Sequence, residues 1–243
     1  METVEIHRTK DMKKLKKPTV IIGFPGTGLV GSIAAAHLID TPDFKFSGYI
    51  TSREFAPLAA IHEYTPMPAA RIHFSAKHNL VVIISEMTIP VSESRELAEK
   101  ILKFANSMKA NSVISLGGIS LQEGGKDVYV VSSDLPVIKN VMKKKIAKPI
   151  KEGATTGVTG VLLTKGTLTK YPVTALLAES SAEFIDPKAA SNVLKTLSKF
   201  IHTPINTSRL DKEARDMAKG TKESIIKSKI SKRGAAGTGG MYG

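Results

Sequence analysis

The sequence predicts an α/β protein whose mostly parallel or mixed sheet is flanked by helices. In the first half of the chain, short runs of β-branched residues alternate with segments of helical apolar spacing, which is typical of βα units. A glycine-rich turn joins the first of these runs to the first helical segment. The length of 243 residues is enough to bury a large core, and it must do so without disulfides because the chain has no cysteine.

The first half supplies its strands and helix in a clear order. A β-branched run at 18–23 predicts a buried strand, and the apolar spacing at 29–39 predicts the helix after it. A weaker strand is expected at 47–51. The runs at 71–75 and 80–85 flank a short polar turn and therefore predict a β-hairpin.

A helix is expected after Pro90, where Ser92 or Ser94 can cap its first turn. The apolar run at 112–116 predicts the next buried strand, which we expect to end at the glycine pair 117–118.

The middle of the chain is less regular. A strand is expected at 128–131, and a further strand or strand end at 174–179. Between them, a threonine-rich stretch is interrupted by three glycines, at positions 153, 157 and 160. Asp186 followed by Pro187 predicts the start of a helix, since an acidic cap and a proline in the first turn are both favoured there.

The composition divides the chain into four segments. A basic N-terminal segment, 1–17, precedes the expected α/β domain, 18–207. A C-terminal helix is expected over 208–233, starting at Ser208 with an acidic residue three positions later. The last ten residues, 234–243, are rich in glycine and predict a flexible tail.

The charge balance predicts an acidic partner or solvated basic faces. There are 35 Lys and Arg against 22 Asp and Glu, which gives a formal net charge of +13. Nucleic acid is disfavoured as the partner because aromatic residues make up only 5% of the chain and tryptophan is absent. The N-terminus is acidic and no apolar run approaches the roughly 20 residues of a membrane helix, so we expect a cytoplasmic protein with no membrane contact.

The turn after the first strand allows three interpretations. Its Gly-x-Gly-x-x-Gly spacing matches the dinucleotide fingerprint, and the helix N-terminus could hold an anion, although Pro25 removes one backbone donor. A P-loop is excluded because Leu29 and Val30 stand where lysine and a hydroxyl residue are required. In the third interpretation the glycines only let the helix pack close to the sheet. An anion site and a structural turn both stay open for Gly23, Gly26, Gly28 and Gly31.

The sequence contains no complete catalytic or metal-binding motif that we recognise. His62 and Glu63 are followed by Pro66 where a zinc motif needs its second histidine, and no Gly-x-Ser-x-Gly elbow occurs. We expect His73 and His78, which flank a turn, to be ordinary polar residues of the surface or of a rim. Three carboxylates could approach one another at the edge of the sheet: Glu54, Glu63 and Glu86.

Several short motifs occur in a fixed order along the chain. They are Gly23-Phe-Pro-Gly-x-Gly-Leu-Val-Gly-Ser-x-Ala-Ala35, Glu54-Phe-Ala-Pro-Leu58, Arg71-Ile-His73, Ser115-Leu-Gly-Gly-Ile119, Gly157-Val-Thr-Gly160, Ala175-Leu-Leu-Ala-Glu179 and Asp186-Pro-Lys-Ala-Ala190. On these motifs the sequence resembles the proteasome assembly chaperone family, above all its archaeal branch. The resemblance implies a nucleoside-phosphorylase-like α/β core, homo-oligomers and binding to proteasome α-subunits. It implies no established catalytic residues, no cofactor and no metal, so we do not expect an enzyme.

The chain ends in Met241, Tyr242 and Gly243, a hydrophobic residue followed by tyrosine and any residue. This pattern resembles the motif with which proteasome activators enter pockets between α-subunits. It combines an apolar anchor, an aromatic ring with a hydrogen-bonding tip and a free carboxylate. Together with the family resemblance, it implies an assembly chaperone or ATP-independent activator that binds the α-ring of the core particle. The alternative is a nucleoside-phosphorylase-like or nucleotide-binding enzyme that uses the glycine turn.

Overall fold

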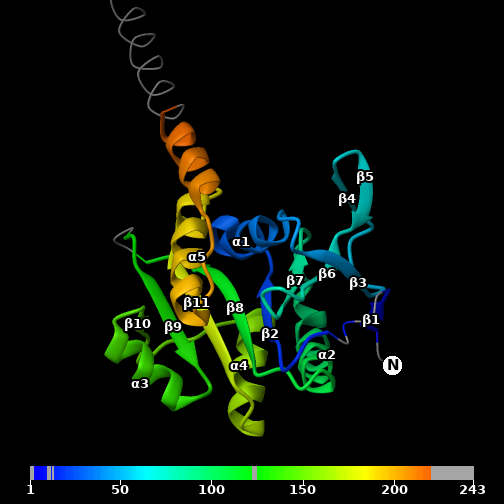
Figure 1. Ribbon diagram of the computed structural model, residues 1–243, viewed down its shortest axis with the longest axis horizontal. Helices are drawn as coiled ribbons and strands as arrows, with labels where there is room; N and C mark the ends of the chain where they lie inside the picture. The colour runs from blue at the N-terminus through cyan, green and yellow to red at the C-terminus, as the bar shows by residue number, and fades with distance from the viewer. Residues whose placement is uncertain (1–2, 10–11, 13, 122–124, 220–243) are drawn as a thin grey trace, which may run out of the picture.

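The computed structural model describes residues 3–9, 12, 14–121 and 125–219. Within these residues, a mixed sheet of nine strands forms the middle layer (Figure 1). In spatial order its strands are β1 (Glu5–Arg8), β3 (Lys45–Thr51), β6 (Ala70–Ser75), β7 (Leu80–Ser85), β2 (Thr19–Gly23), β8 (Ser112–Ile119), β11 (Val173–Glu179), β9 (Val128–Ser132) and β10 (Lys148–Pro149).

The centre of this sheet is parallel and its flanks contain antiparallel pairs. Strands β7, β2, β8 and β11 run parallel to one another. On one side β6, β3 and β1 continue with antiparallel pairing, and on the other β9 pairs antiparallel with β11. The predicted α/β class with a mixed sheet is therefore confirmed, while the nucleoside-phosphorylase-like detail stays a prediction.

Helices cover both faces of the sheet. They are α1 (Val30–Ile39), α2 (Ser94–Ser107), α3 (Leu135–Lys144), α4 (Gly157–Thr169) and α5 (Pro187–Ile201). In β2, Val20 and Ile22 pack into the core shared with α2 and α4, whereas Ile21 packs into the core shared with α1 and α5. Successive strand residues point to opposite faces, so a strand covered on both sides is apolar throughout. This explains why the central strands are continuous β-branched runs.

Two predicted element ends are wrong. Strand β8 does not stop before its glycines, because Gly117 and Gly118 stay in register with β11 and the strand ends at Ile119. Neither Ser92 nor Ser94 caps α2 through its side chain. A 3-10 turn at Val91–Glu93 comes first, and Ser94 Oγ instead donates to the carbonyl of Pro90 at 3.3 Å.

Several elements have no counterpart in the prediction. The threonine-rich stretch with its glycines contains α4, whose Val158, Leu162 and Leu163 are buried in the core that also contains α2. Helix α3 and strand β1 were also not predicted, nor was a second, two-stranded sheet formed by β4 (Ala59–His62) and β5 (Thr65–Pro68). In α4, tertiary packing outweighs the low helix propensity of glycine and threonine.

The C-terminal helix begins at Ser208, as predicted, and is described as far as residue 219. The rest of the expected helix and the tail at 234–243 lie outside the described residues. Asp211 holds the first turn against α5, because it accepts from Lys188 Nζ at 2.8 Å, Lys195 Nζ at 2.6 Å and Ser191 Oγ at 2.9 Å. We call this group, with the residues around it, the helix root. No helix within the described residues has the length and apolar character needed to cross a membrane.

Candidate functional site

The glycine turn forms a close junction between β2, α1 and β8. A Cβ placed on Gly31 would lie 2.4 Å from the carbonyl oxygen of Leu116, and one on Gly23 would lie 2.2 Å from the carbonyl oxygen of Gly31. Gly28 has a φ of 61°, and its carbonyl accepts from the amide of Asp186 at 3.0 Å. Three of the four glycines are thus required by packing or by backbone conformation, whereas a Cβ on Gly26 would meet open space.

A small crevice of about 250 Å³ opens beside Gly26, at the carboxyl ends of β2 and β8. Hydroxyl groups dominate its polar lining, and Ser115 Oγ lies 2.7 Å from Thr159 Oγ1 across it. Ligands of open α/β sheets bind at this edge. However, none of the described residues that line the crevice is ionisable, and Glu54 lies exposed in the loop before β4. The described lining of the crevice therefore offers hydrogen bonds to a small polar group.

A buried polar cluster lies where β6, the end of β7 and β4 meet. Arg71 on β6 is only 2% exposed, and its Nη2 donates to Glu86 Oε1 at 2.9 Å. The same nitrogen lies 2.8 Å from His62 Nε2, which lies 2.9 Å from Glu86 Oε1. Burial alone would raise the pKa of Glu86, but hydrogen bonds from Arg71 and His62 outweigh it and the pKa is lowered. The cluster is therefore a charge pair that holds His62, the last residue of β4, to the main sheet.

This cluster answers one question that the sequence left open. Of the three candidate carboxylates, Glu86 belongs to the cluster, Glu63 lies in the β4–β5 turn and Glu54 lies in the preceding loop. The three carboxylates therefore lie in three different segments, and Glu86 pairs with Arg71.

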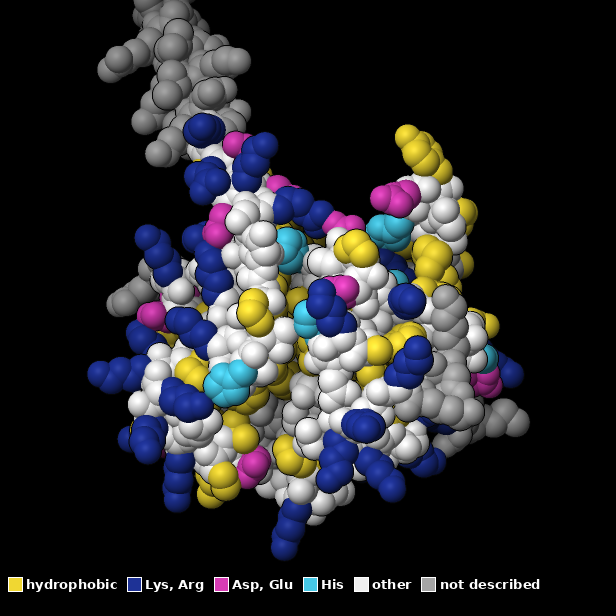
Figure 2. Space-filling model, in the orientation of Figure 1, with side chains coloured by type: hydrophobic (Ala, Val, Ile, Leu, Met, Phe, Trp, Pro, Cys, Tyr) yellow, Lys and Arg dark blue, Asp and Glu magenta, His cyan; other side chains and the backbone are white. Residues whose placement is uncertain are grey.

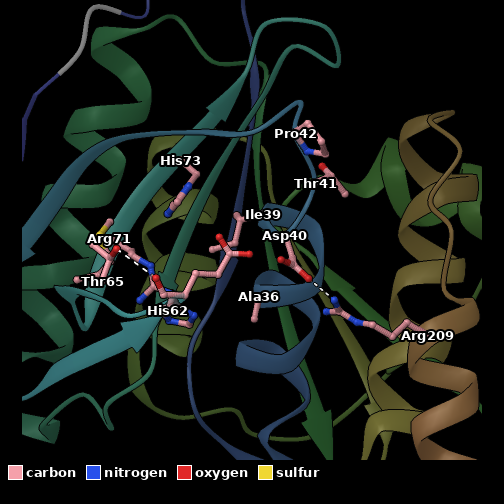
Figure 3. A pocket seen from close by; sticks show the side chains of 12 residues that line it. Ala36, Ile39, Asp40, Thr41, Pro42, His62, Thr65, Arg71, His73 and Arg209 are labelled. Carbon is pink, nitrogen blue, oxygen red and sulfur yellow. Dashed lines mark hydrogen bonds and ion pairs between the residues drawn. The ribbon is translucent and has the colours of Figure 1, made fainter.

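A larger cavity of about 690 Å³ lies between the β4–β5 hairpin, β6, the end of α1 and the helix root (Figure 3). Ala36, Ile39 and Met67 supply apolar lining, and Arg209 pairs with Asp40 at its rim. Its remaining lining residues are Thr41, Pro42, His62, Glu63, Thr65, Arg71 and His73.

His73 lines this cavity, as the expected rim position allows, but it is more buried than an ordinary surface histidine. It lies within β6, half-buried against Phe46, and its Nε2 is buried without a hydrogen-bond partner in the described structure. Burial lowers the pKa of His73 to about 4, with the neighbouring Arg71 acting in the same direction. The imidazole is therefore neutral at neutral pH. Successive side chains of a strand point to opposite faces, and Ile72 packs into the core shared with α2 and α4. This alternation was the one sequence signal that could have placed His73 on the other face, beside the cavity.

The β4–β5 hairpin, here called the arm, projects from the body of the molecule (Figures 1 and 2). Its exposed surface combines polar residues such as Glu63 with two large apolar ones, since Tyr64 at the turn is 100% exposed and Ile61 is 72% exposed. Glu63 and Tyr64 form the turn and both have positive φ, 46° and 64°. No hairpin is predicted here from the sequence, because the usual Asn-Gly or Asp-Gly pair is missing and two prolines interrupt β5.

The predicted docking residues Met241, Tyr242 and Gly243 lie outside the described residues. The start of the C-terminal helix that precedes them is described. Asp211 binds it to α5, and His37 Nε2 donates to the carbonyl of Asn206 at 2.6 Å just before the helix.

The sheet with helices on both faces, and the crevice at the carboxyl ends of its parallel strands, define an open α/β protein. Comparison with known proteins places it further. The chain belongs to the PAC2 family, whose model matches residues 20–225.

Relatives of the chain agree with this assignment. An uncharacterized protein of Methanocaldococcus jannaschii is 30% identical over 210 residues, which cover 86% of each chain. The solved structure of Pyrococcus furiosus PbaA, described as an archaeal homolog of proteasome-assembly chaperone, is 26% identical with a TM-score of 0.84 over 96% of each chain. Pyrococcus furiosus PbaB, described as an archaeal proteasome activator, is 26% identical with a TM-score of 0.79, covering 92% of this chain and 99% of PbaB. The suspected resemblance to archaeal proteasome assembly chaperones is thus confirmed.

Proposed function

We propose that the protein is a proteasome assembly chaperone or ATP-independent activator that binds the α-ring of the core particle. It acts in the cytoplasm as a homo-oligomer and docks partly through Met241, Tyr242 and Gly243. The observation that carries this proposal is a docking motif at the end of a chain whose fold matches both PbaA and PbaB.

The helix root supports a role of the C-terminal segment in docking. Asp211 holds the first turn of the helix to α5, and Arg209 pairs with Asp40 at the end of α1. Contacts to two helices fix the direction in which the segment leaves the body. A fixed direction lowers the entropy cost of docking, because fewer orientations are lost on binding.

The proposal includes no catalytic activity and no cofactor. Glycines that are required by packing account for most of the turn, and the crevice beside it has no ionisable lining among the described residues. The hydroxyl groups of that crevice favour one alternative, a nucleoside-phosphorylase-like or nucleotide-binding enzyme. Thermal-shift measurements with phosphate, nucleosides and nucleotides separate the two proposals. A ligand present at 100 times its Kd raises the free energy of unfolding by about 2.7 kcal/mol.

The decisive experiment changes the tail and measures binding to purified core particle. Tyr242→Ala should weaken binding at least tenfold, and so should a few residues appended after Gly243, because they displace the carboxylate. Thr238→Ala is the matched control and should bind like the parent. The oligomer mass should stay unchanged in all three variants. If both tail variants bind as tightly as the parent, docking must come from the globular surface.

A further inference from the structure

The arm exposes an apolar surface without support from the rest of the sheet. It contains only β4 and β5, and in the described structure neither strand pairs with a third. Two-stranded hairpins of this kind are marginally stable in water. Tyr64 and Ile61 together place a fully exposed ring and a mostly exposed aliphatic side chain at its end. Covering them would remove apolar surface from water and stabilise the arm at the same time.

The turn of the arm presents Tyr64 in a fixed and costly conformation. Left-handed backbone costs a non-glycine residue about 1–2 kcal/mol, and here two successive residues, Glu63 and Tyr64, adopt it. Asn-Gly would form the same turn with less strain. The strained turn holds the tyrosine at the outermost point of the arm, where it is free of contacts with its own chain.

The end of β4 next to the turn is held to the main sheet by side-chain contacts. His62, the last residue of β4, contacts both the buried Arg71 and Glu86. An arm that is already fixed in position loses little conformational entropy when its tip binds.

The cavity beside the arm has the chemistry to receive a tyrosine. Its apolar lining from Ala36 and Ile39 suits an aromatic ring, and His73 Nε2 is a buried polar atom without a partner in the described structure. A buried tyrosine hydroxyl seeks such a partner. Arg209 lies at the rim, where it pairs with Asp40 of the same chain. A volume of about 690 Å³ exceeds what one tyrosine side chain and its neighbours need.

Tyr64 does not fill the cavity of its own chain, because it is fully exposed. The arm and the cavity nevertheless adjoin each other (Figure 3). When a protruding group and its receptor adjoin on one surface, a two-fold axis can place each group over the receptor of the other copy. The contact is then made twice, which doubles the area that is buried.

We propose that the arm is exchanged between two copies of this chain, with Tyr64 of one copy inserted into the cavity of the other and its hydroxyl bonded to His73. The proposal rests on the homo-oligomer of the proposed function and identifies one of its interfaces. Tyrosines at the centre of an interface are often its strongest contacts. Tyr64→Ala should therefore weaken self-association at least tenfold.

Sedimentation velocity over a range of protein concentrations tests this expectation. Ala36→Trp, which fills the cavity, should weaken self-association like Tyr64→Ala. Leu168→Ala, which truncates an exposed residue near the end of α4, is the matched control and should associate like the parent. Circular dichroism shows whether each variant is folded. A parent that is monomeric, or folded Tyr64→Ala and Ala36→Trp variants that associate like the parent, would overturn the proposal.

The absence of cysteine permits a second test that needs no loss of stability. Single variants Tyr64→Cys and Ala36→Cys are mixed and oxidised. Leu168→Cys mixed with Ala36→Cys is the control mixture. A higher yield of covalent dimer from Tyr64→Cys mixed with Ala36→Cys than from the control mixture supports the exchange. An equal yield from the two mixtures contradicts it. Because neither test contains proteasome, failure here leaves the tail-docking proposal intact, and failure of tail docking leaves the exchange intact.

Discussion

Asp211 makes the strongest electrostatic contact of the helix root, so its charge can be tested directly. Asp211→Asn keeps the size of the side chain and one acceptor oxygen but removes the ion pairs with Lys188 and Lys195. Both lysines are about half exposed, and exposed pairs contribute about 0.2–1 kcal/mol each. We expect the docking of the helix root to weaken by about 1 kcal/mol, while the fold of the sheet is unaffected.

Hydrogen exchange followed by mass spectrometry measures this change locally. A loss of about 1 kcal/mol corresponds to about fivefold faster exchange of the amides at 208–219. Asp216→Asn, which removes a charge from an exposed residue of the same helix, is the control and should change the rate little. Equal exchange in Asp211→Asn and the parent would refute the reasoning that the two lysines hold the root.

The same contact has a defined pH dependence. Hydrogen bonds from Lys188 and Lys195 hold the pKa of Asp211 well below its usual range in the folded protein. A depressed folded pKa means that the stabilisation is present above the unfolded value of about 3.9 and is lost as the pH falls below it toward the folded value. Protection of 208–219 in the parent should therefore decline below about pH 4 and approach that of the variant.

Three further predictions concern the body of the molecule. Gly31→Val should lower the free energy of unfolding by about 3 kcal/mol, because its Cβ would collide with the backbone of β8. Gly26→Ala, whose Cβ meets open space, should not lower it. Equal melting temperatures of these two variants would contradict a structural role of the glycine turn. Glu86→Ala should cost about 3–5 kcal/mol in urea unfolding, because it leaves the buried Arg71 unpaired; a loss under 1 kcal/mol would show that the cluster can be rearranged. Neutralising the exposed lysines at 143–145 should slow association with core particle at low salt only, as stopped-flow rates can show; an unchanged rate at low salt would exclude steering by this block.

Features that depend on local pattern could be predicted from the amino-acid sequence. The continuous apolar runs identified the central strands, because strands buried on both faces need apolar residues at every position. Asp186 and Pro187 located the start of α5, where Asp186 indeed accepts from the amide of Ala189 at 2.8 Å. The family could also be recognised, since its motifs keep their order along the chain.

Features that depend on contacts between distant segments became visible in the folded protein alone. Helix α4 forms in a glycine- and threonine-rich stretch because Leu162 and neighbouring residues find a buried place beside α2. Arg71, His62 and Glu86 come from three separate strands or strand ends, so no spacing in the sequence reveals that they share one buried cluster. The arm is held by that cluster and not by a favourable turn sequence. Local propensities act over a few residues, whereas burial and charge pairing act across the whole fold, and the cavity beside the arm results from the second kind of interaction.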